Sequence, residues 1–218
     1  MTVLAFDLGG TRLKAAVVDG DTPFTLQVHE PSSLTAVAEV GRRLLPADVV
    51  GICVPGLVDD TGVVRVLPGK LPGVEGTDLR AFLGETFGLP VGAVVNDAAA
   101  FGWAEAAARP GRRVLTATIG TGLGTALVER DGAVRGLLTG QLFEGPLVRT
   151  FGGLVDAIVG MCFAHEPDVV VVGGGGAPPL DGVEAAVNER LAPWLTVAVE
   201  PAVSGDAGGV IGVALLSQ

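Results

Sequence analysis

Short apolar runs that end at glycine or proline alternate along this chain with longer segments in which apolar residues recur every three or four positions. The first pattern is typical of buried strands and the second of amphipathic helices. We expect strands at Val3–Phe6, Leu13–Val18, Val49–Val54, Val91–Val95, Val114–Ile119, Thr125–Glu129, Val169–Val172 and Thr196–Val199. We expect helices from Ser32 or Ser33 to about Leu45, at Asp78–Phe87, Asp97–Arg109, Leu147–His165 and Asp181–Leu191, and from about Asp206 onward. Alternating strands and helices predict an α/β protein.

The opening pattern of the chain recurs in its second half. When Val3 is placed on Val114, Gly9 falls on Gly120, and each half then opens with a strand, a glycine turn and a second strand. In a chain with 34 glycines, two hairpins could resemble each other by chance. The interpretation we prefer is a duplicated fold whose two glycine turns face each other across a cleft.

The two glycine turns, Gly9-Gly10-Thr11 and Gly120-Thr121-Gly122, are candidate phosphate-binding elements. A glycine-rich phosphate loop usually opens a helix, whose first amides attract the anion, but the residues after both turns favour strands. The spacing also matches neither the P-loop nor the dinucleotide-binding fingerprint. We therefore expect β-turns whose backbone amides point into a concavity, with the hydroxyls of Thr11 and Thr121 as further donors.

Two carboxylates stand at the ends of apolar runs that we expect to be buried strands. Asp7 is either a residue that caps the turn or a ligand that holds Mg²⁺, directly or through water, beside nucleotide phosphates. Asp97 follows Asn96 at the end of a later run and is either a helix N-cap or a general base. The second role suits its place, because ligands of α/β proteins bind beyond the carboxyl ends of the strands.

Composition disfavours several classes of protein. The 218 residues include 14 Lys and Arg against 24 Asp and Glu, a formal charge of −10, whereas a protein that binds nucleic acid presents a basic face. No apolar stretch reaches the ~18 residues of a spanning helix, and the first residues, MTVLAFDLGG, lack the basic region of a secretory signal. Cys53 and Cys162 form no paired motif, so we expect a reduced, cytoplasmic protein. From the acidic charge and the short apolar stretches, we expect no nucleic-acid or membrane partners.

Several motifs, in order along nearly the whole chain, together resemble the ROK family of sugar kinases, within the actin/hexokinase/Hsp70-like ATPase superfamily. These are Asp7-Leu8-Gly9-Gly10-Thr11 with Lys14 and Asp19, Val54–Asp59, Leu71-Pro72-Gly73, Asn96–Ala100, Ile119–Gly124 and Val170–Gly175. The resemblance implies a duplicated, two-lobe actin-like ATPase fold of the ribonuclease H-like type, with the nucleotide in the cleft between the lobes. The N-terminal lobe would be residues 1–109 and the C-terminal lobe residues 110–218, with the last helix able to pack back on the N-terminal lobe.

The same resemblance implies an enzyme, a glucokinase-like kinase that phosphorylates a sugar hydroxyl with ATP and Mg²⁺. Asp97 matches the family's general base, Asn96 and Glu144 would bind the sugar, and Asp7 would position Mg²⁺. The nucleotide would be held by Asp7, Gly9, Gly10, Thr11, Lys14, Gly120, Thr121, Gly122, Gly173, Gly174 and Gly175. We also expect a homodimer with a small-molecule sugar as substrate.

The chain departs from the family pattern on the sugar side. It lacks the zinc motif of Cys and His, so we expect no zinc. The segment directly after Glu144, Gly145-Pro146-Leu147, supplies no His, and Lys70 and Ala99 stand where the family generally has Asn. These changes keep open a second hypothesis, a catalytically weakened protein that binds nucleotide or sugar as a sensor. A third hypothesis is a kinase with another donor, such as polyphosphate, or with a non-sugar alcohol as acceptor. A repressor of this family would carry a helix-turn-helix before Asp7, and we expect none in the six residues there.

Overall fold

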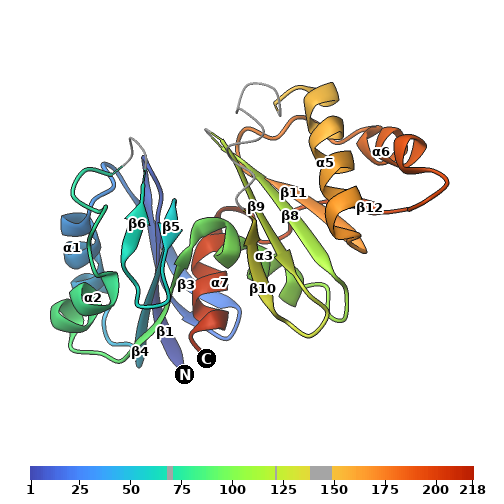
Figure 1. Ribbon diagram of the computed structural model, residues 1–218. Coiled ribbons are helices and arrows are strands. Elements are labelled where there is room, and N and C mark those ends of the chain that lie inside the picture. Colours follow the sequence, from blue (N-terminus) through green and yellow to red (C-terminus); the bar gives the residue numbers. More distant parts are fainter. Residues whose placement is uncertain (68–70, 121, 138–148) are drawn as a thin grey trace. The chain divides into compact units, whose positions relative to one another are not determined.

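The structure, a computed structural model, describes residues 1–67, 71–120, 122–137 and 149–218. The chain forms two compact units. Unit 1 comprises Met1–Ala100 together with Ala207–Gln218, and unit 2 comprises Phe101–Asp206. Each unit is built on a five-stranded sheet (Figure 1). The division between the units falls inside helix α3 (Asp97–Ala107).

The sheet of unit 1 has the strand order β3-β2-β1-β4-β7. Its strands are β1 (Thr2–Leu8), β2 (Leu13–Asp19), β3 (Thr22–His29), β4 (Val49–Val54) and β7 (Val91–Asn96). The helices of this unit are α1 (Leu34–Leu44), α2 (Leu79–Phe87) and α7 (Gly208–Leu216), and β5 (Leu57–Val58) and β6 (Val64–Val66) form a separate ribbon. β1 pairs antiparallel with β2 and parallel with β4, which pairs parallel with β7.

Both faces of the unit 1 sheet are buried, and Figure 1 shows α1 and α2 on one side of it and α7 on the other. Alternate residues of a strand point to opposite faces. Phe6 therefore packs in the cluster that includes α1 and α2, whereas Val3 and Ala5 pack in the cluster that includes Val210 of α7. Asp7 follows Val3 and Ala5 in this alternation, so its side chain lies on the face that α7 covers.

The sheet of unit 2 repeats the same order as β10-β9-β8-β11-β12. Its strands are β8 (Val114–Ile119), β9 (Leu123–Val128), β10 (Val134–Leu137), β11 (Val169–Gly173) and β12 (Ala198–Pro201), its helices are α5 (Phe151–His165) and α6 (Val183–Leu191), and the 3₁₀ helix η1 (Gly205–Ala207) follows. The antiparallel and parallel pairings also correspond to those of unit 1. The duplication predicted from placing Val3 on Val114 is therefore confirmed, with β1 and β8 at the centre of their sheets.

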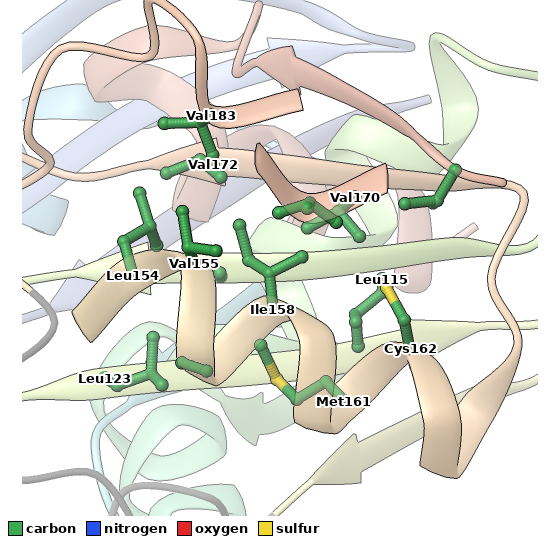
Figure 2. Packing of buried hydrophobic residues seen from close by; sticks show 14 of the residues in the cluster. Leu115, Leu123, Leu154, Val155, Ile158, Met161, Cys162, Val170, Val172 and Val183 are labelled. Carbon is green, nitrogen blue, oxygen red and sulfur yellow. The ribbon is translucent and has the colours of Figure 1, made fainter. Parts of the chain in front are cut away.

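Helix α5 covers one face of the unit 2 sheet through side chains at helical spacing. Figure 2 shows Leu154 and Ile158 of the helix directed at the strands, and both are fully buried in one cluster with Leu115 and Val170. The opposite face of the sheet packs against α3 through a smaller cluster that includes Ala106. The ends of the central strands, where the candidate site residues lie, are thus held by a packed core in each unit.

The expected elements match the central strands and the helices, and the differences fall at the sheet edges and in the unexpected β5–β6 ribbon. Strand β3 was not expected, because it is an edge strand with exposed and half-buried residues in place of a continuous apolar run. Helix α5 begins after its N-cap Thr150, and the expected start at Leu147 lies outside the described residues. Within the described ranges, the structure has no helix both long and apolar enough to span a membrane.

Candidate active site

The carboxylate of Asp7 lies at the end of β1, between side chains of both neighbouring strands. In the sheet register Asp7 stands opposite Lys14 of β2 and beside Cys53 of β4. The Lys14 ammonium is 3.7 Å from Asp7 Oδ2, and the Cys53 thiol donates to Asp7 Oδ1 across 3.7 Å. Only 17% of the Asp7 side chain is exposed. The sheet therefore brings a largely buried carboxylate, a cation and a thiol together.

The charges around Asp7 leave its carboxylate poorly compensated. Its pKa is raised from 3.8 to about 6, mainly by burial, which outweighs the opposing charge of Lys14. The nearby carboxylate of Asp97 also raises the pKa of Asp7, while the Cys53 thiol lowers it. Burial raises the pKa of the Cys53 thiol well above its ordinary value, and the charges of Asp7 and Asp97 add to this rise. An additional cation would stabilise both carboxylates here.

The first turn of α7 lies directly against Asp7. A Cβ on Gly209 would stand 2.7 Å from the Asp7 carboxylate carbon and 2.9 Å from the Asp7 Cβ, so the contact admits only glycine. Gly212 in the same helix allows a second close approach, because a Cβ there would stand 1.8 Å from the Ala100 carbonyl oxygen. The sequence analysis did not single out Gly209. The pair Gly208-Gly209 near the start of an expected helix could have indicated a close contact there.

The turn after Asp7 is tight and exposes its backbone. The Gly9 amide donates to the Arg12 carbonyl across 3.0 Å, and a Cβ on Gly9 would stand 2.9 Å from that same oxygen. Gly10 and Thr11 are exposed. Gly10 and Thr11 are therefore exposed next to the carboxylate predicted to hold Mg²⁺, as backbone that binds an anion must be. The Gly9 amide is instead engaged within the turn.

Asn96 and Asp97 form the junction between β7 and α3. Asn96 Oδ1 accepts hydrogen bonds from the Ala98 and Ala99 amides, so Asn96, and not Asp97, is the N-cap of α3. Asp97 Oδ1 accepts a hydrogen bond from the amide of the next residue, Ala98, across 2.8 Å. The Asn96 amide nitrogen donates to the Gly56 carbonyl across 2.8 Å. Both the oxygen and the nitrogen of the Asn96 side-chain amide thus bind backbone groups of the chain. Asp97 itself is half-buried.

Two glycine segments of unit 2 meet beyond the ends of β8 and β11. The Gly120 amide donates to the Gly122 carbonyl across 3.0 Å, and the Gly176 amide donates to the Ile119 carbonyl across 2.9 Å. Gly174 has a φ of +91°, and a Cβ there would stand 2.3 Å from the Ile119 oxygen, so this position requires glycine. The segments predicted to bind phosphate and adenosine are therefore hydrogen-bonded neighbours.

The other two glycines predicted to line an adenosine pocket have different surroundings. A Cβ on Gly173 would stand 2.7 Å from the ring of Phe101, so close packing explains this glycine. A Cβ on Gly175 would meet no described atom within 4 Å. Sequence reasoning also missed Arg149, whose guanidinium donates to the Gly120 carbonyl; it follows no motif, and only the fold brings it to these segments.

The remaining predictions concern metal and sugar binding. Thr121 and Glu144 lie outside the described residues, as does Lys70. Across the described ranges, no group of three or more His, Cys, Asp or Glu side chains could hold a metal ion. Mg²⁺ commonly takes one or two carboxylates together with waters and substrate phosphates. Asp7, with its raised pKa and with Asp97 nearby, fits such a partial set of ligands.

Residues 3–141 match the family model described as the ROK family. The chain is 34% identical over 152 residues to the N-acetylmannosamine kinase of Salmonella typhi, a match that covers 65% of this chain and 50% of the relative. The chain thus spans about half the length of the curated relatives it matches.

Solved structures of the same family share the fold. The chain superimposes on the ROK hexokinase from Thermus thermophilus with a TM-score of 0.79 at 24% identity, over 100% of this chain and 98% of that one. A ROK family glucokinase from Streptomyces griseus, in complex with glucose and AMPPNP, gives a TM-score of 0.76 at 20% identity, over 100% and 99%. The fold is the duplicated α/β fold of the actin-like ATPases. Since the family model covers more than half of the sequence, the chain belongs to the ROK family.

Proposed function

We propose that this protein transfers the terminal phosphoryl group of ATP to a hydroxyl group of a sugar. The observation that carries the proposal is the pair of carboxylates in unit 1, Asp7 and Asp97, which lie close enough for the charge of one to raise the pKa of the other. Asp7 lies near the carboxyl end of the central strand β1, and Asp97 directly follows the edge strand β7. The carboxyl ends of the strands are the usual ligand-binding edge in α/β proteins. Membership of the ROK family supports kinase activity as the function of these two carboxylates.

Asp97 is the proposed general base. Its carboxylate accepts the proton of the attacking hydroxyl as the hydroxyl oxygen bonds to the terminal phosphorus, and the bond from that phosphorus to the leaving oxygen breaks to release ADP. Such a transition state is loose, so positioning and charge stabilisation contribute more than covalent chemistry by the protein. General-base assistance is typically worth about 10²–10⁴-fold in rate. The hydrogen bond from the Ala98 amide to Asp97 Oδ1 helps to orient this carboxylate.

Asp7 and Lys14 are the proposed residues of unit 1 that offset the negative charge of the phosphates. Asp7 would hold Mg²⁺, directly or through water, and the bound ion would neutralise negative charge that develops on the phosphates. The Lys14 ammonium, 3.7 Å from Asp7, orients the carboxylate and adds a positive charge beside the Gly9 turn. The backbone of Gly10 and Thr11, which are exposed in that turn, would donate to phosphate oxygens.

The class of acceptor is proposed from the relatives. The curated relatives are N-acetylmannosamine kinases, and the Streptomyces griseus glucokinase was solved with glucose and AMPPNP, an analogue of ATP. Both acceptors are six-carbon sugars or N-acetylated derivatives of them. Hexoses and N-acetylhexosamines are therefore the acceptors to test first.

One observation favours a second candidate, a protein that binds nucleotide or sugar without efficient turnover. The side chain of Asn96, predicted to hold the sugar, makes its hydrogen bonds to backbone groups of Gly56, Ala98 and Ala99. A sugar would have to compete with these bonds or use other residues. The chain also lacks the His that the family carries after the position of Glu144.

A turnover assay separates the two candidates. The purified chain is incubated with ATP and Mg²⁺ against glucose, mannose, N-acetylglucosamine and N-acetylmannosamine, and ADP and sugar phosphate are measured together. A kinase releases ADP only with an acceptor and makes one sugar phosphate per ADP. A sensor shows no turnover but still gains thermal stability with its ligand, by about 2.7 kcal/mol at a ligand concentration of 100 Kd. ADP without sugar phosphate contradicts the proposed transfer.

A further inference from the structure

Arg149 lies against both glycine segments of unit 2. Its guanidinium donates a hydrogen bond to the Gly120 carbonyl. Its Nε atom is 3.3 Å from the point where a Cβ of Gly176 would stand, so the side chain runs alongside the second segment as well. The side chain is exposed. The positively charged guanidinium of Arg149 thus lies beside the uncharged backbone of Gly120 and Gly176.

Packing does not account for all the glycines around this side chain. A Cβ on Gly120, Gly122 or Gly175 would meet no described atom within 4 Å, in contrast to Gly173 and Gly174. Gly120 and Gly175 are also not among the glycines with a positive φ. Among the described residues, neither crowding nor a positive φ therefore requires glycine at Gly120 or Gly175. A backbone without side chains at these positions would allow the close approach of a ligand.

Charge identifies the part of the ligand that Arg149 would meet. The chain carries a formal charge of −10, which disfavours the approach of a polyanion unless a local cation offsets it. Guanidinium groups bind phosphate through two parallel N–H donors, a geometry that an ammonium cannot reproduce. The bond to Gly120 uses one of the five N–H donors of Arg149.

We propose that Arg149 binds a phosphate group of the nucleotide at the Gly120 turn of unit 2. The inference rests on the proposed function and adds to it a cationic residue that no motif of the sequence marks. Arg149 then serves as a phosphate-binding residue, and its hydrogen bond to the Gly120 carbonyl holds the guanidinium beside the turn.

Calorimetric affinities for ATP, ADP and adenosine test this role in the wild type, Arg149→Ala and Arg149→Lys. We expect Arg149→Ala to weaken ATP binding by about tenfold or more, since charge-assisted hydrogen bonds are lost, and to leave adenosine binding unchanged. Arg149→Lys should recover only part of the loss, because Lys supplies charge without the planar pair of donors. Arg190→Ala is the matched control, since Arg190 is an exposed arginine of unit 2 that pairs with Asp156.

The results distinguish phosphate binding from a purely structural bond. Equal losses of ATP and adenosine affinity in Arg149→Ala, or a fall in its unfolding temperature that the control lacks, would mean that Arg149 only braces the turn. Unchanged ATP affinity in Arg149→Ala contradicts the inference outright, as does a wild type that binds no ATP. ATP binding that depends on Arg149, without formation of sugar phosphate, would support the inference and refute the proposed kinase activity.

Discussion

Gly209 lies so close to Asp7 that a Cβ on residue 209 would stand 2.7 Å from the Asp7 carboxylate carbon. The two residues come from opposite ends of the chain, one in the last helix and the other in the first strand. Helix α7 packs on the same face of the sheet to which Asp7 points. The end of the chain therefore fixes the position of a carboxylate near its beginning.

Substitution of Gly209 by Ala should disturb Asp7. The added methyl group overlaps the Asp7 side chain and its Cβ, which strand β1 holds in place. Overpacking of this kind typically costs about 1–3 kcal/mol of stability. Misplacement of a reacting group by about 1 Å can cost 10²-fold in rate, so turnover should fall and the Mg²⁺ concentration needed for half-maximal rate should rise. Urea unfolding and a Mg²⁺ titration of turnover measure the two effects.

Gly84→Ala provides the control for this substitution. A Cβ on Gly84, in helix α2 of the same unit, would stand 3.6 Å from a Val91 methyl carbon, an ordinary contact. Alanine favours a helix over glycine by about 1 kcal/mol, so this variant should be as stable as the wild type or more so. Wild-type stability and Mg²⁺ dependence in Gly209→Ala would refute the role assigned to the close contact.

A buried ionic network in unit 2 is the second target. Glu105 is fully buried and accepts hydrogen bonds from the Arg109 guanidinium across 2.7 Å and from the amides of Val203 and Ser204. It thereby joins α3 to the segment that follows β12. Glu105→Ala removes one partner of a buried charge and should lower the free energy of unfolding by about 3–5 kcal/mol.

The exposed pair of Arg190 and Asp156 gives the comparison for this network. Both side chains are more than half exposed, and exposed ion pairs contribute about 0–1 kcal/mol. Asp156→Asn should therefore barely change the unfolding transition in urea. Similar losses of unfolding free energy in Glu105→Ala and Asp156→Asn would show that the buried network contributes no more stability than an exposed ion pair.

The stability of unit 2 should depend on pH through Asp168. Hydrogen bonds from the Arg130 guanidinium and the Arg113 amide lower the pKa of this carboxyl below 3.8. A lowered pKa means that the carboxylate stabilises the fold above its unfolded pKa and that this contribution is lost as the pH falls through the folded pKa. The stability difference between the wild type and Asp168→Asn should thus be constant near neutrality and shrink as the pH falls below the ordinary carboxyl pKa of 3.8. Urea unfolding across that range measures it; a difference independent of pH rejects the assignment.

Both thiols should be inert in the folded protein. Cys53 and Cys162 are fully buried, and burial raises the pKa of Cys162 to about 12. The thiolate is the reactive form of cysteine, so neither residue should react with a disulfide reagent under native conditions, and both should react in denaturant. Rapid labelling of Cys53 in the native state would mean that the surroundings of Asp7 open to solvent.

Much of the fold could be predicted because its strands are buried on both faces. Continuous apolar runs mark such strands, and placing Val3 on Val114 was enough to predict the duplication. Ser33 and Asp78 also cap α1 and α2 where capping residues precede the apolar pattern. Strand β3 escaped because an edge strand needs no continuous apolar run.

The candidate site could be predicted only where local motifs mark it. Asp7, the glycine turns and Asp97 each follow an apolar run, and that position is visible in the sequence. The contacts of Gly209 and Cys53 with Asp7 depend on helix packing and strand register, and the contact of Arg149 with Gly120 depends on the path of the chain. Such long-range relationships leave no local pattern, so the sequence alone could not reveal them.

The most direct test of the central claim is the rate of sugar phosphate formation by the wild type and by Asp97→Asn, followed by phosphorus NMR with ATP, Mg²⁺ and the best acceptor of the panel. We predict sugar phosphate and ADP in equal amounts from the wild type. We predict a rate lower by about 10²–10⁴-fold in the variant, with ATP affinity retained. Equal rates in the two proteins, or a wild type that binds ATP and forms no sugar phosphate with any acceptor, would contradict the account.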